Sequence, residues 1–142
     1  MPVNNFLSSD GLIIDQSKLK TIPYGKYTSD YNGCGWIATY NAMKMLGEKV
    51  DEQEIIRYLN KYNILDGKLG TNSFGIKKYF EGQNLGFKSA FLSKRLQVKK
   101  NAVGILLYTD GKSAHYVAFQ GKKIPLWYLT LSGKSPVSLK GR

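Results

Sequence analysis

The chain has 142 residues and carries 21 basic against 10 acidic side chains, a formal net charge of +11. Hydrophobic residues make up 42% of it and aromatic residues 13%. This composition excludes an intrinsically disordered chain and fits one globular domain that can bury a core without a metal. A single cysteine excludes an internal disulfide and favours a reducing compartment.

The start of the chain, Met1 to Leu7, has neither a basic segment nor a long apolar run, so we expect no signal peptide. No stretch approaches the roughly 20 apolar residues of a membrane span. We therefore expect a cytoplasmic protein with no membrane span. Secretion stays open, because removal of a leader would leave the same sequence.

The positive charge favours acidic partners, nucleic acid among them. However, the basic residues are spread along the chain, and the densest cluster is Lys94, Arg95, Lys99 and Lys100. No Arg-rich helix, aromatic RNA-binding signature or zinc-finger spacing accompanies them. We interpret them as a solvated surface, which argues against nucleic acid as the partner. Nucleic-acid binding would show itself as an affinity that falls steeply with salt.

Residues 1–30 predict an irregular N-terminal arm, with a turn at Pro23-Tyr24-Gly25. Residues 34–46 predict a helix, because apolar side chains recur at helical spacing on a broad face. Those side chains are Trp36, Ile37, Ala38, Tyr40, Ala42, Met43 and Met45. Gly47 is expected to end this helix, which we expect to be central and buried.

Two further helices are expected before residue 82. One covers about 51–62, where Asp51 and Glu54 have the spacing of a capping box and Ile55, Leu59 and Tyr62 share a face. The other begins near Thr71 or Asn72, buries Ile76, Tyr79 and Phe80, and ends at Gly82.

The remainder of the chain has the pattern of strands. We expect strands at Phe87–Phe91, at Val103–Tyr108, at His115–Phe119 and at Leu126–Leu131, with a turn at Asp110-Gly111. Helices followed by a β-meander predict an α+β fold. The expected organisation is one domain over 1–142, with the arm at 1–30, a helical part at 31–82 and an antiparallel sheet at 86–142.

The single cysteine and the single histidine carry the strongest functional signal. Cys34 opens the central helix, where unpaired N–H groups and the helix dipole favour a thiolate over a thiol of pKa about 8.5. Gly33 and Gly35 flank it and are expected to leave the backbone open to a substrate. His115 begins a strand at the sheet rim and can act as the base. The backbone N–H of Cys34 can donate to a developing oxyanion.

These segments resemble bacterial papain-like cysteine peptidases, specifically the C39-like group. The resemblance covers roughly residues 30–120 and depends on Asn32-Gly33-Cys34-Gly35-Trp36, Gly70-Thr71 and Ala114-His115-Tyr116-Val117. It implies a papain-like α+β fold, a thiolate–imidazolium pair and acyl-enzyme hydrolysis of a peptide or amide bond. Cys34 matches the nucleophile and His115 the base. No cofactor and no metal are implied, and with one histidine and one cysteine a zinc site is not expected.

Two departures from the family pattern leave a second function open. No glutamine lies between Gln16 and Cys34 to complete the oxyanion hole, so Asn32 is the candidate donor. No Asp, Glu or Asn follows Asp110 to orient the imidazole, although Gln120, Thr130, Ser132 or a backbone carbonyl could substitute. The alternative is a catalytically impaired relative that binds a peptide or an acidic partner. The sequence does not indicate an oligomeric state.

Overall fold

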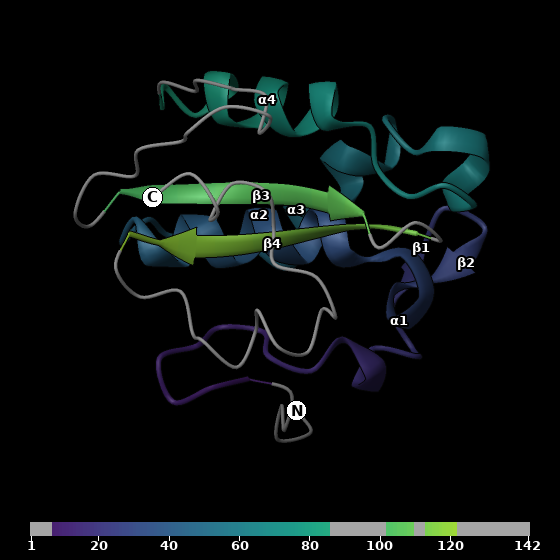
Figure 1. Ribbon diagram of the computed structural model, residues 1–142, viewed down its shortest axis with the longest axis horizontal. Helices are drawn as coiled ribbons and strands as arrows, with labels where there is room; N and C mark the ends of the chain where they lie inside the picture. The colour runs from purple at the N-terminus through teal and green to yellow at the C-terminus, as the bar shows by residue number, and fades with distance from the viewer. Residues whose placement is uncertain (1–6, 86–101, 110–112, 122–142) are drawn as a thin grey trace. The chain divides into compact units, whose positions relative to one another are not determined.

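The computed structural model describes residues 7–85, 102–109 and 113–121 (Figure 1). The chain divides into two compact units, Met1–Phe87 and Lys88–Arg142. Within the described residues, the first unit holds the helices and one two-stranded sheet, and the second holds one two-stranded sheet. The chain is therefore of mixed helix and strand, as an α+β fold requires.

The N-terminal arm contains several very short elements. These are the 3-10 helix η1 (Gln16–Lys18), the antiparallel strands β1 (Pro23–Tyr24) and β2 (Tyr27–Thr28), and helix α1 (Ser29–Asn32). Elements of two to four residues are too short to produce a periodic apolar pattern, which is why the sequence predicts only an irregular segment there. The turn predicted around Gly25 joins β1 to β2, and Gly25 has a φ of 64°.

Helix α2 (Cys34–Met45) confirms the predicted central helix. Its buried residues include Trp36, which is fully covered, and Met43, which is 2% exposed. The helix ends in a Schellman motif. The N–H of Glu48 donates to Met43 O at 3.1 Å, and the N–H of Gly47 donates to Lys44 O at 3.0 Å. Gly47 has a φ of 78°, the left-handed conformation that favours glycine at this position.

Helix α3 (Glu52–Asn60) begins as predicted and ends two residues earlier than expected. The Asp51 carboxylate accepts from the N–H of Gln53 at 2.9 Å and so caps the first turn. The chain then tightens, because the N–H of Tyr62 donates to Leu59 O, three residues back, at 2.8 Å. The chain next forms a second 3-10 segment, η2 (Ile64–Gly67).

Helix α4 (Ser73–Gly82) begins after Asn72, whose side-chain oxygen accepts from the N–H of Phe74 at 2.9 Å. The predicted stripe of Ile76, Tyr79 and Phe80 is buried. This stripe and the buried faces of α2 and α3 form the apolar core of the first unit. The largest fully covered side chains of that core are Trp36, Tyr24, Leu19, Met43, Ile55, Leu59 and Ile76.

The second unit contains a hairpin of β3 (Val103–Thr109) and β4 (Ala114–Gln120), which confirms two of the predicted strands. The strands are antiparallel, with Val103 opposite Gln120 and Tyr108 opposite His115. Gly104 on β3 is opposite Phe119 on β4, and the Phe119 ring lies against it. A Cβ at position 104 would be 2.6 Å from Phe119 Cζ, so the close approach of the ring requires glycine. The expected strands at Phe87–Phe91 and Leu126–Leu131, and the turn at Asp110-Gly111, lie outside the described residues.

The buried phenol of Tyr79 makes the stability of the first unit sensitive to alkaline pH. Burial and, to a smaller extent, the nearby carboxylates of Glu54 and Asp51 together raise the pKa of Tyr79 to about 12. The unfolded chain ionises a tyrosine near pH 10. The stability gained by keeping this phenol neutral is therefore complete below about pH 10 and is lost as the pH rises toward about 12.

We predict that Tyr79→Phe makes the free energy of unfolding fall less steeply between about pH 10 and 12. Urea denaturation followed by circular dichroism at a series of pH values measures this slope. Tyr27→Phe is the matched control, because Tyr27 is 38% exposed. A Tyr79→Phe slope equal to that of the parent would contradict the prediction.

Candidate functional site

Cys34 is the first residue of α2, and its side chain is partly exposed at the start of an otherwise buried helix. The residues that follow it, Gly35 to Tyr40, are all buried. Gly33 precedes the helix as its N-cap residue and, being glycine, has no side chain that could bond to the first turn. The positive end of the helix dipole lies near the sulfur, which favours a thiolate there.

The two glycines beside Cys34 are required by packing. A Cβ at Gly33 would lie 2.6 Å from Ser29 O, and a Cβ at Gly35 would lie 2.6 Å from Thr71 Oγ1. Both distances are shorter than real Cβ contacts allow, so only glycine fits at either position. Gly33 and Gly35 are thus explained by the close approach of α1 and of Thr71, and not by an open backbone as the sequence led us to expect.

The loop before α4 reaches the first turn of α2 through Thr71. Thr71 is 3% exposed, and its hydroxyl is hydrogen-bonded to the hydroxyl of Tyr24. Trp36, in the same first turn of α2, donates from Nε1 to Ser29 Oγ at 3.0 Å. These contacts hold the start of α2 between β1, α1 and the 63–71 loop, so the backbone that carries Cys34 is fixed on several sides.

Asn32 lies two residues before Cys34 and is buried, with 4% of its surface exposed. Its Nδ2 donates to Tyr24 O at 2.9 Å and to Gly67 O at 3.0 Å. If the amide were flipped, Oδ1 would face two carbonyl oxygens, neither of which can donate a hydrogen bond. The two acceptors therefore determine the orientation of the Asn32 amide. These bonds use both amide hydrogens. The oxyanion role expected for Asn32 therefore has no donor in this arrangement.

His115 lies on β4, opposite Tyr108 on β3, and its ring centroid is 5.5 Å from that of Tyr108. Its Nε2 is 2.8 Å from Ser113 Oγ, within hydrogen-bonding distance. Ser113 lies immediately before β4, two residues from His115. The family pattern places the orienting residue after the histidine, so Ser113, which precedes it, was not expected.

The structure thus brings Cys34 and Asn32 together at the start of α2 in the first unit. It brings His115, Ser113 and Tyr108 together in the second unit. Across the described residues, no cluster of three or more His, Cys, Asp or Glu side chains could hold a metal ion. Within the same residues, the helices are too short or too polar to cross a membrane.

Comparison of the chain with protein-family models, with curated proteins and with solved structures finds no match. The resemblance to papain-like peptidases of the C39-like group therefore depends on the motifs around Cys34, Thr71 and His115 alone.

We predict that Asn32→Ala lowers the free energy of unfolding by about 1–3 kcal/mol, because two buried carbonyls lose their donor. Urea denaturation of the variant and of the parent measures the difference. Gln53→Ala is the control, since it removes an exposed amide from α3 and should change stability by no more than about 0.5 kcal/mol. Loss of turnover without loss of stability would instead assign Asn32 to the oxyanion hole.

Proposed function

We propose that this chain is a thiol-dependent hydrolase, a cysteine peptidase of papain-like fold in the C39-like group, that cleaves a peptide or amide bond. The observation that carries the proposal is the position of Cys34, the partly exposed first residue of a largely buried helix whose N-cap residue is a glycine. A thiolate is favoured at that position, and a thiolate is the reactive form of cysteine.

The proposed reaction uses His115 as the base and Cys34 as the nucleophile. The imidazole takes the thiol proton, and the sulfur attacks the carbonyl carbon of the scissile bond. The oxyanion of the tetrahedral intermediate is stabilised by backbone N–H groups of the first turn of α2. The imidazolium then protonates the leaving amine, and the C–N bond breaks. Water hydrolyses the thioester with His115 as base, which regenerates the thiol.

Ser113 supplies the orienting contact that the sequence pattern lacks. In enzymes of this kind a third group holds the imidazole in one tautomer and orientation. In this proposal the contact between Ser113 Oγ and His115 Nε2 performs that task, and Nδ1 is the ring nitrogen that takes the thiol proton. Ser113 is a positioning residue in this proposal, because it acts through the imidazole.

We predict that iodoacetamide at about pH 6 alkylates Cys34 of the folded protein about tenfold faster than it alkylates the same thiol in urea. A thiolate exists at this pH only if the fold stabilises it. His115→Ala should remove the advantage, because the cationic partner is lost. Mass spectrometry of quenched samples measures the rates. Equal rates in the folded and unfolded parent would reject a reactive thiolate.

We predict that Ser113→Ala slows this alkylation roughly tenfold and changes its dependence on pH, because the imidazole loses its orienting contact. Ser113→Thr retains the hydroxyl and should restore most of the rate. Ser9→Ala, at an exposed serine of the first unit, is the matched control. If Ser113→Ala keeps the rate and pH profile of the parent, Ser113 does not position His115.

A specific observation favours the alternative of an impaired relative that binds a peptide or an acidic partner. Asn32 uses its amide hydrogens inside the unit, and no carboxylate or Asn side chain follows Asp110 in the sequence. Two groups that support turnover in the family are thus replaced or reassigned. Absence of turnover, with peptide binding unchanged in Cys34→Ala, would establish this alternative.

A further inference from the structure

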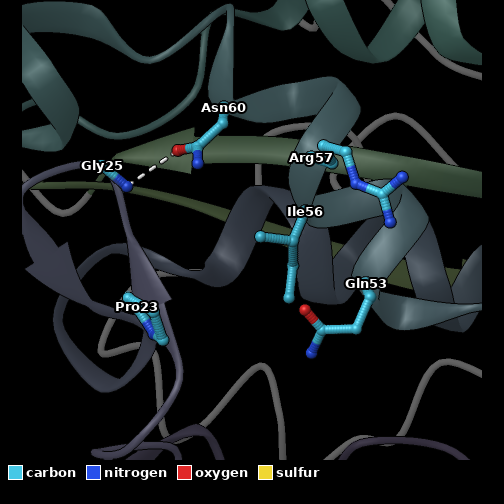
Figure 2. A pocket seen from close by; sticks show the side chains of 6 residues that line it. All are labelled: Pro23, Gly25, Gln53, Ile56, Arg57 and Asn60. Carbon is cyan, nitrogen blue, oxygen red and sulfur yellow. Dashed lines mark hydrogen bonds between the residues drawn. The ribbon is translucent and has the colours of Figure 1, made fainter.

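A hollow of about 260 Å³ lies in the first unit between β1 and α3 (Figure 2). Figure 2 shows Pro23 and Gly25 on one side of it and the side chains of α3 on the other. The α3 residues are spaced as one stripe of a helix, at positions i, i+3, i+4 and i+7. They are Gln53, Ile56, Arg57 and Asn60.

Two of the three polar side chains of this stripe, Asn60 and Arg57, have only donors left to offer. Asn60 Oδ1 accepts from the N–H of Gly25 at 2.8 Å and from Asn63 Nδ2 at 2.7 Å. Both lone pairs of that oxygen are therefore used, and the Nδ2 group of Asn60 remains to donate. Arg57 has only donors and forms no ion pair with any described residue of the chain. The third, Gln53, has both a donor and an acceptor on its amide and can donate as well.

No carboxylate lines the hollow among the residues that the structure describes. Asp51 is bonded to the N–H of Gln53 at the helix start, and Glu54 lies one position along the helix from Gln53, on a different face. An exposed guanidinium on the same helical stripe as two side-chain amides, without a carboxylate in the lining, matches a ligand that has acceptors and a negative charge.

The remaining lining is apolar. Ile56 is 6% exposed and Pro23 faces it across the hollow. A purely polar anion would leave this surface in contact with nothing but water. At about 260 Å³ the space is smaller than the roughly 300–1,000 Å³ of pockets that hold drug-sized ligands. It suits one amino-acid residue with its carboxylate.

We propose that the hollow between β1 and α3 binds the C-terminal residue of a peptide. The terminal carboxylate accepts from Arg57 and from the amides of Asn60 and Gln53. The apolar side chain of the same residue lies against Ile56 and Pro23. The site involves neither Cys34 nor His115, so it does not depend on the proposed hydrolase activity.

Titration of the full-length ¹⁵N-labelled protein with N-acetyl-leucine tests this proposal, and N-acetyl-leucinamide is the matched neutral ligand. We expect N-acetyl-leucine to change the backbone chemical shifts of β1 and α3 only, and we expect N-acetyl-leucinamide to bind more weakly.

Arg57→Gln should weaken binding of the acid about tenfold, because a charge-assisted hydrogen bond is lost. Asn60→Asp retains an acceptor for Gly25 and should weaken it further. Lys49→Gln, which removes a charge at an exposed position outside the hollow, should change nothing.

Four results would overturn the proposal. The first is no saturable shift with the acid, and the second is equal binding of acid and amide. The third is binding that survives both Arg57→Gln and Asn60→Asp. The fourth is competition by inorganic phosphate at the concentration at which the acid binds, which would mean that the apolar surface does not contribute. Circular dichroism of each variant confirms that a loss of binding is not a loss of fold.

Discussion

The burial of helix α2 is the constraint on which the rest of the first unit depends. A helix covered along most of its length must be packed on several sides, and α1, α3, α4 and the 63–71 loop contribute to that packing. Only its ends can meet solvent. Cys34 is the residue at one of those ends, so the packing that stabilises the unit also determines where the single thiol of the chain is accessible.

The close packing around α2 is possible because small residues and buried polar bonds occur at the contacts. Gly67, with a φ of 99°, lies where a Cβ would be 2.4 Å from Asn32 Nδ2. Asn32 in turn joins β1 to the end of η2 through two carbonyls. A buried amide that satisfies backbone carbonyls stabilises a loop junction that apolar side chains could not, since unpaired carbonyls are costly to bury.

The helices and the hairpin could be predicted from the sequence because their patterns are local. Apolar spacing, an Asp or Asn cap and a terminal glycine are read within one segment, and α2, α3 and α4 follow them. The contacts of Asn32 and Gly35 could not be predicted in this way. They depend on Gly67 and Thr71, more than thirty residues away in the chain. The contact of Ser113 with His115 is local, since the two residues are only two positions apart.

The same reasoning explains why the hollow beside α3 was not expected from the sequence. The predicted apolar face of α3 contained Ile55, Leu59 and Tyr62 and left Ile56 unassigned, although Ile56 is only 6% exposed. Ile56 is covered at the edge of that face, where β1 approaches the helix. The helix positions next to such a residue on the solvent side are polar, and here they are Gln53, Arg57 and Asn60. An apolar edge beside donors suits the small amphipathic anion that we propose, and the Gly25–Asn60 bond joins the turn after β1 to α3 at this edge.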